Sequence, residues 1–270
     1  DRLGNKQTYH YEGGLLARIS QTNGETTYYD YDYTSKQLKA VRTQAYKDGV
    51  PQDISRVAYD YDSEGRLWKV LVDLTPENQT DSEVYETTYT YHGNSKLLRT
   101  LEQTDGSKLT FEYKAGTNKV EKVTDALGQT TKFDYFESEK RTQVTNPLNQ
   151  VTTFSYDAKG QLKKVEAPAV PGQPILATQF EYDTVTGDLI RLTQPGNRIT
   201  EFKYNNGNLT EQRDALGNLI TRRYDALNQV LAETVTVGVS ETLTSRYVYE
   251  AVGAKQLLRY FVSASGQVTE

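Results

Sequence analysis

The sequence has no cysteine and only two histidines among its 270 residues. Without thiols the chain cannot form disulfides, zinc knuckles, iron–sulfur sites or a thiol nucleophile, and the covalent staples of small secreted folds are excluded with them. A histidine-based triad or metal centre is close to excluded as well, because His10 and His92 are the only imidazoles and His10 is the middle residue of an aromatic-x-Tyr step. We therefore expect no cofactor and no metal site.

Apolar residues are also scarce, and they never form a long run. Only 36% of the residues are hydrophobic, and the mean hydropathy is −0.71. No apolar stretch approaches the length that a membrane span requires, so no membrane-spanning segment is expected. Tyrosine, with 21 copies, supplies much of the apolar surface. Its flat body and polar tip suit a thin layer that is partly dry and partly wet, rather than a thick aliphatic core.

Charge of one sign is not concentrated anywhere along the chain. The sequence has 31 Lys and Arg against 36 Asp and Glu, and the absence of a basic stripe argues against nucleic-acid binding. No spacing singles out two carboxylates for glycoside hydrolysis. The turn glycines lack the strand-to-helix context and the lysine of a phosphate loop. No catalytic residue is predicted, and we do not expect an enzyme.

What the sequence does contain is a repeat, and repeats indicate arrays of small structural units. An aromatic residue, any residue and a tyrosine recur along the chain, and the second tyrosines from Tyr91 to Tyr156 are 21 or 22 residues apart. The pairs predicted to be structural repeat aromatics are Tyr9 and Tyr11, Tyr59 and Tyr61, Tyr89 and Tyr91, Phe111 and Tyr113, Phe133 and Tyr135, Phe154 and Tyr156, Phe180 and Tyr182, and Phe202 and Tyr204.

Each pair predicts a strand, because residues two apart in an extended chain point to the same face. The polar alternation around the pairs, as in residues 130–135, is typical of a half-buried strand. A Gly-x-Leu step after most pairs predicts a turn and a second strand. An Asp-Ala-Leu-Gly-like turn, as in residues 125–128, ends that strand, with Asn149 or Asn228 in the glycine place elsewhere. One repeat is therefore two strands and two tight turns.

The predicted fold class is all-β, with stacked β-hairpin repeats forming one long, curved antiparallel sheet. Rings stacked between hairpins are expected to hold the repeats together. Residues 1–270 are expected to form a single array that is cut within a repeat at both ends. The strands at its ends would have unpaired edges, so self-association of the chain is expected. Four stretches interrupt the period. The three that contain proline are expected to be loops: 48–54, 73–88 and 167–178. The fourth, 232–245, lacks proline and is expected to be a longer hairpin.

Three segments carry a family resemblance: residues 59–67 (YDYDSEGRL), 156–162 (YDAKGQL) and 224–230 (YDALNQV) closely resemble the YD repeat, also called the Rhs repeat. The resemblance recurs over nearly the whole chain. It implies a β-sheet ribbon that spirals into a hollow shell. Such shells enclose a C-terminal toxin in bacterial Rhs proteins and insecticidal toxin complexes, and form part of an adhesion receptor in teneurins. The family's self-cleavage site contains an Asp-Pro pair, and this sequence has no Asp-Pro pair. No residue of this chain is therefore assigned a role in self-cleavage.

Two functions follow. The first is a non-catalytic wall segment that encloses or presents another part of a large secreted or surface protein of a bacterium, with that parent polypeptide as its partner. The alternative is an adhesion or carbohydrate-binding module in which exposed tyrosines stack on sugars. Packing is favoured over an exposed binding platform for Trp68. The acid pairs Asp30/Asp32 and Asp60/Asp62 fit turn or solvated positions, with calcium binding as the alternative.

Overall fold

The computed structural model describes residues 6–78, 81, 83–238, 241–252 and 255–270. These residues form 23 β-strands and no helix, so the all-β prediction is confirmed. Because the described residues contain no helix, none of them offers a helical membrane span. The chain divides into two compact units, Asp1–Lys132 and Phe133–Glu270.

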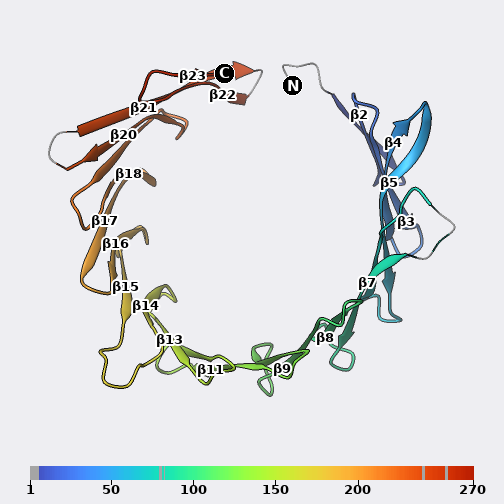
Figure 1. Cartoon of the computed structure of the whole chain (residues 1–270), viewed down its shortest axis with the longest axis horizontal. Helices are drawn as coiled ribbons and strands as arrows, with labels where there is room; N and C mark the ends of the chain where they lie inside the picture. Colours follow the sequence, from blue (N-terminus) through green and yellow to red (C-terminus); the bar gives the residue numbers. More distant parts are fainter. Residues whose placement is uncertain (1–5, 79–80, 82, 239–240, 253–254) are drawn as a thin grey trace. The chain divides into compact units, whose positions relative to one another are not determined.

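Unit 1 is a run of antiparallel strands, each paired with the strand that precedes or follows it in the sequence. Figure 1 shows these strands following one another in a single curved layer. The strands are β1 (Gln7–Glu12), β2 (Leu15–Gln21), β3 (Thr26–Asp32), β4 (Gln37–Lys47), β5 (Val50–Tyr61), β6 (Leu67–Asp73), β7 (Val84–Tyr91), β8 (Leu98–Gln103), β9 (Lys108–Tyr113), β10 (Val120–Asp125) and the first part of β11 (Thr130–Phe136).

Unit 2 continues the same antiparallel, hairpin-after-hairpin pairing within its own curved layer (Figure 1). After the last part of β11 its strands are β12 (Arg141–Thr145), β13 (Val151–Tyr156), β14 (Leu162–Glu166), β15 (Ala177–Tyr182), β16 (Leu189–Gln194), β17 (Arg198–Asn205), β18 (Asn208–Arg213), β19 (Leu219–Tyr224), β20 (Val230–Val237), β21 (Glu241–Val252), β22 (Lys255–Val262) and β23 (Val268–Thr269).

The tight turns are closed by an Asp or Asn side chain. In the turn after Tyr61, Asp62 Oδ1 accepts hydrogen bonds from the backbone N–H groups of Glu64 at 3.0 Å and Arg66 at 2.8 Å. The fourth residue of the turn, Gly65, has φ 74°. Glycine adopts this conformation without steric cost, and asparagine tolerates it. As predicted, the same place has positive φ in the other turns of this kind, at Gly128, Asn149, Gly160, Gly217 and Asn228.

A β-bulge precedes the second tyrosine of most repeats, and the sequence pattern did not reveal it. Tyr61 pairs with Leu67 while Asp60 pairs with Lys69, so Trp68 is an extra residue in β6. Bulges of this kind bend the strand and increase its twist. The register shifts in the same way at His10/Tyr11, Asp30/Tyr31, Thr90/Tyr91, Ser155/Tyr156, Glu181/Tyr182, Lys203/Tyr204, Arg223/Tyr224 and Val248/Tyr249.

No hydrophobic core lies within the described residues. Their one buried residue is polar: Asp53, 4% exposed. The accessible surface of the chain is 18,208 Å², whereas a compact monomer of this mass exposes about 12,000 Å². The apolar residues are therefore spread through a single layer, as the composition indicated.

The expectation of a loop at residues 48–54 is wrong. Strand β4 turns directly into β5 through Asp48 and Gly49, whose φ angles are 53° and 79°. An Asp-Gly pair with two positive φ angles is the strongest two-residue hairpin signal, and it prevails over the proline. Pro51 lies opposite Tyr46, where β5 extends beyond its pairing with β6 and so has a free side.

The other interruptions follow the expectation more closely. Residues 167–176 connect β14 to β15 as a loop, and residues 232–245 form the longer hairpin of β20 and β21, with residues 239 and 240 outside the described part. Residues 74–83 connect β6 to β7, with residues 79, 80 and 82 outside the described part. Residues 84–88, expected in that loop, belong to β7 instead.

Candidate functional site at the joints between repeats

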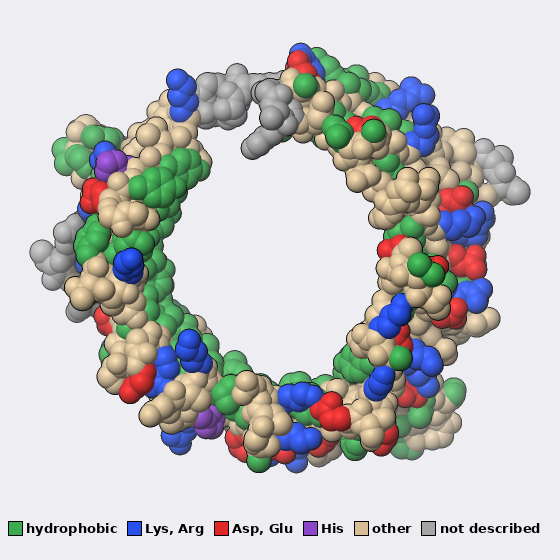
Figure 2. Space-filling model, turned by 180° about the vertical axis from the view of Figure 1, so that it is seen from behind, with side chains coloured by type: hydrophobic (Ala, Val, Ile, Leu, Met, Phe, Trp, Pro, Cys, Tyr) green, Lys and Arg blue, Asp and Glu red, His purple; other side chains and the backbone are tan. Residues whose placement is uncertain are grey.

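The two faces of the layer differ in chemistry. On one face of unit 2, Glu181, Arg191 and Glu201 lie opposite one another on successive strands, with Arg191 Nη2 3.1 Å from Glu201 Oε1. On the other face Phe180 lies opposite Leu192. Figure 2 shows hydrophobic side chains along the concave side of unit 1 and charged side chains along the convex side of unit 2. Each strand therefore alternates between a charged face and an aromatic or aliphatic face.

The predicted repeat aromatics fall into two groups by exposure. Tyr9 and Tyr11, on the first strand, are 51% and 61% exposed. The other fourteen are half-buried, and they are Tyr59, Tyr61, Tyr89, Tyr91, Phe111, Tyr113, Phe133, Tyr135, Phe154, Tyr156, Phe180, Tyr182, Phe202 and Tyr204.

The expected stacking of rings between hairpins is wrong in the registers observed. In most pairs the first ring lies opposite an aliphatic residue of the next strand, whereas Phe202 lies opposite Gln212. That strand separates the rings of successive repeats by two strand spacings, about 9.5 Å. The ring contacts found in the described chain are between His92 and Tyr113, at 5.4 Å, and between Tyr247 and Phe261, at 5.3 Å. The aliphatic partners are seen in Tyr59 with Val70, Tyr89 with Leu101, Phe111 with Val123, Phe154 with Val165 and Phe180 with Leu192.

A tyrosine hydrogen bond connects the repeats instead. We call a joint the place where the second strand of one repeat meets the first strand of the next, at the sheet edge that carries the turns after the aromatic pairs. At the β4–β5 joint, Tyr61 Oη donates to the backbone carbonyl of Leu38 at 2.9 Å. The bond recurs from Tyr91 to Leu67, from Tyr113 to Leu98, from Tyr182 to Leu162 and from Tyr224 to Leu209.

Burial raises the pKa of the Tyr61, Tyr91 and Tyr182 hydroxyls above the ordinary tyrosine value. A raised pKa keeps the hydroxyl protonated, which the donor role requires. The tyrosine hydrogen bonds are therefore fully present at neutral pH.

A second bridge crosses the same joints from the middle residue of the Gly-x-Leu step. Gln161 Nε2 donates to the carbonyl of Gly187, in the turn of the next repeat, at 2.9 Å. Gln37 makes the equivalent bond to Gly65 at 3.0 Å. The other examples are Arg66 to the carbonyls of Gly93 and Ser95, and Asn208 to the Asn228 side chain. Four of the five joints with a tyrosine hydrogen bond thus have a second bridge from the variable position, whereas the Gln229 side chain makes no bridge at the β20–β21 joint in the described structure.

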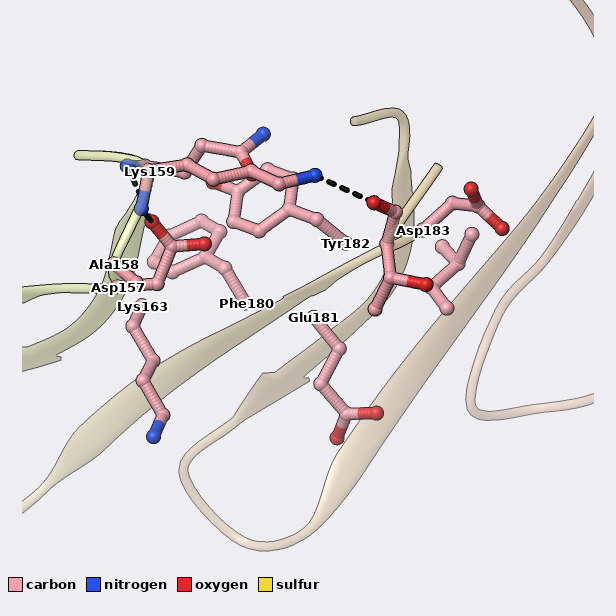
Figure 3. Close-up of a pocket in the computed structure, with 11 residues that line it drawn as sticks. Asp157, Ala158, Lys159, Lys163, Phe180, Glu181, Tyr182 and Asp183 are labelled. Atoms are coloured by element: carbon pink, nitrogen blue, oxygen red, sulfur yellow. Dashed lines mark hydrogen bonds between the residues drawn. The ribbon is translucent and has the colours of Figure 1, made fainter. Parts of the chain in front are cut away.

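A hollow of about 430 Å³ lies at the β14–β15 joint. Figure 3 shows Phe180 and Tyr182 pointing toward the turn that holds Asp157 and Lys159, while Glu181 points away. Lys159 Nζ donates to the carbonyl of Thr184, so the amine is already engaged. Equivalent residues of unit 1 line a hollow of about 460 Å³: Asp32, Gln37, Lys39, Tyr59, Asp60, Tyr61 and Trp68.

The acid pairs do not converge on a cation site. Asp32 lies 3.3 Å from Lys39, and backbone N–H groups of Ser35 and Thr34 lower its pKa. Asp62 Oδ2 accepts from Arg66 Nε at 2.7 Å. Among the described residues no cluster of three acidic or histidine side chains could hold a metal. These carboxylates act in turns and ion pairs.

Trp68 is 38% exposed, and Lys69 Nζ lies 4.7 Å from the centre of its ring. The bulge before Tyr61 sets this exposure, because the extra residue of β6 has no cross-strand partner. The indole is thus partly exposed to solvent and in contact with the Lys69 side chain.

Comparisons with known proteins agree with the repeat structure. A family model described as RHS Repeat matches residues 206–240, which include the β18–β19 joint. A comparison with curated proteins finds no match. Among solved structures, the fold is similar to that of TcdB2-TccC3 without its hypervariable C-terminal region, with a TM-score of 0.51, 14% identity and 97% of this chain covered.

Two further structures give the same result. The TcdB2-TccC3-Cdc42 crystal structure has a TM-score of 0.52 at 13% identity, and a Tc holotoxin pore of Photorhabdus luminescens with a mutated TccC3 has 0.52 at 14%, both over 97% of this chain. The chain spans 15% of the length of each of the three. Identities this low show the fold alone. The resemblance is confirmed: this chain carries an Rhs repeat at residues 206–240, in a fold similar to that of the Tc toxin structures.

Proposed function

We propose that the chain is a non-catalytic wall segment of an Rhs-type shell, continuous over residues 1–270, which encloses or presents another part of a large secreted or cell-surface protein of a bacterium. The observation that carries this proposal is the single layer without a hydrophobic core in its described residues. A layer with an apolar face and a charged face separates two compartments, and it gains stability when something covers the apolar face.

Protection from protease tests this proposal on the parent polypeptide. A protease cleavage site is placed in the part of the parent that the wall is proposed to enclose, and its rate of cleavage is compared with that of the same part expressed alone. We expect cleavage in the parent to be slower by orders of magnitude. Equal rates would overturn enclosure. The matched control places the site in the loop of residues 167–176, which is expected to be cut in the parent as well because its residues are mostly exposed.

A carbohydrate-binding or adhesion module is the second candidate. It is supported by the partly exposed Trp68 beside a hollow that also contains Asp60 and Gln37, since a ring with neighbouring polar groups suits a sugar. The engaged state of Gln37 at the joint weighs against it. A glycan array decides: saturable binding lost in Trp68→Ala and kept in Tyr113→Phe would favour this candidate over the wall.

Self-association through strand edges is a further part of the proposal. Within the described residues β1 pairs with β2 and β23 pairs with β22, and an unpaired strand edge offers its backbone groups to another chain. Light scattering over a range of concentrations checks it. A monomer at every concentration would contradict it.

A further inference from the structure

The β16–β17 joint lacks both bridges that the neighbouring joints of unit 2 carry. At β14–β15, Tyr182 and Gln161 donate across the joint, and at β18–β19, Tyr224 and Asn208 do so. At β16–β17 the corresponding residues are Tyr204 and Asp188. In the described structure neither side chain makes a hydrogen bond across the joint.

The residue at the variable position differs at this joint from those of the two adjacent repeats. Asp188 occupies the place that holds Gln161 and Asn208 in the adjacent repeats. An ionised carboxylate only accepts hydrogen bonds, so it cannot bridge to the carbonyl of Gly207 in the next turn as Gln161 bridges to Gly187.

The hydroxyl of Tyr204 is affected as well. Burial is the larger cause of its raised pKa, and the charge of Asp188 is the second. The substitution of one donor by one acceptor coincides with the loss of both bonds.

What remains at this joint is the strand ladder and one exposed ion pair. The register pairs Arg191 with Glu201 and runs on to Gln194 with Arg198, toward the turn at the far edge. Arg191 and Glu201 are 40% and 51% exposed, and an ion pair in such surroundings adds little stability. The ladder ends at Arg191 and Glu201, so the joint-side ends of β16 and β17 are held by the packing of half-buried side chains such as Tyr204, without a side-chain hydrogen bond across the joint.

We propose that the β16–β17 joint is an opening point built into the unit 2 sheet, where the strands separate locally while the β14–β15 and β18–β19 joints stay closed. Local opening occurs where the fewest interactions must break. This inference does not depend on what the wall encloses. It identifies a place where such a wall opens locally without global unfolding.

Hydrogen exchange measured by mass spectrometry on the whole chain tests the proposal. Peptides that cover residues 189–191 and 201–205 are compared with those covering 162–164 and 179–182, and with those covering 209–211 and 221–224. We expect the first set to exchange about four- to a hundredfold faster, since two hydrogen bonds are missing and each changes the opening equilibrium by about two- to tenfold. Equal exchange at the three joints would overturn the proposal without any variant.

Three variants test the cause. Asp188→Gln supplies the donor found in the neighbouring repeat, and exchange at residues 189–191 and 201–205 should slow to the rate of the β14–β15 joint. Asp188→Ala removes the charge without supplying a donor, and exchange should stay fast. Gln161→Asp should speed exchange at residues 162–164 and 179–182. Fast exchange in Asp188→Gln, or equal slowing by Asp188→Ala, would contradict the role of the missing donor.

Discussion

Tyr61 donates its hydroxyl proton to the backbone carbonyl of Leu38, 23 residues earlier in the chain, at 2.9 Å. Strands β4 and β5 are connected by their turn at Asp48 and Gly49, at the opposite edge of the sheet. The tyrosine therefore closes the end of the strand pair that has no covalent connection. Five joints have this bond, each from the tyrosine at the second position of the repeat, where a phenylalanine has no hydroxyl to donate.

Removing this hydroxyl should weaken the joint. We expect Tyr61→Phe to lower the free energy of unfolding by about 0.5–1.5 kcal/mol, because the ring stays in place and one partly buried hydrogen bond is lost. Urea unfolding followed by circular dichroism measures the change. Tyr59→Phe is the matched control: it removes a hydroxyl two residues away that makes no hydrogen bond in the described structure, and its effect should be smaller. Equal effects of the two changes would contradict the assignment.

The effect of a substitution at a turn position with positive φ should depend on whether the new residue tolerates that backbone conformation. Gly217 has φ 86°, and no atom lies within 4 Å of where a Cβ would be. Gly217→Ala should therefore destabilise through backbone strain alone, by about 1–2 kcal/mol. Asn149 has φ 60° in the equivalent turn, and Asn149→Gly should be close to neutral in the same thermal or urea unfolding assay. A neutral Gly217→Ala would show that the turn relaxes to another conformation.

The strands and turns could be predicted because their causes are local. The alternation around Phe133 and Tyr135 sets the face of each side chain, and Asp-x-x-Gly turn chemistry operates within five residues, as at Asp62 and Gly65. Where two local signals competed, the expectation was wrong. The proline at Pro51 indicated a loop, but the Asp-Gly turn three residues earlier formed a hairpin instead.

The joints could not be predicted because they depend on register between strands of different repeats. A bulge adds one residue to β6 at Trp68, and nothing in the alternation of apolar and polar residues marks it. The expected ring stacking ignored the strand that lies between successive rings. The bridging role of Gln161 and Arg66 could have been suspected only from the length and donor character of the variable residue in Gly-x-Leu.

Stability should fall in acid because turn carboxylates are ionised in the folded state. Backbone N–H groups of Thr186 and Val185 donate to Asp183 and lower its pKa. Asp214 has a lowered pKa through hydrogen bonds that include the Asn218 side chain and backbone. A lowered folded pKa adds stability above the unfolded value of about 3.9, and this stability is lost as the pH falls through the folded pKa.

Unfolding free energies measured between pH 6 and pH 2 check this expectation. Asp183→Asn keeps an oxygen acceptor that does not titrate, so its stability should depend less on pH in this range than that of the unchanged chain. Identical pH profiles for the two proteins would contradict the role of the Asp183 carboxylate.

The tyrosine hydrogen bonds predict that stability also falls at alkaline pH. Burial raises the pKa of Tyr61, Tyr91 and Tyr182 in the folded chain. Their stabilisation is fully present below the unfolded value of about 10, and it is lost as the pH rises through the folded pKa because the unfolded chain ionises first. Urea unfolding between pH 8.5 and pH 11.5 should show this loss. The triple change of these tyrosines to phenylalanine should lower stability at pH 8.5 and flatten the decline above pH 10, since the ionisable donors are gone. The same slope in both proteins would exclude the tyrosines as its source.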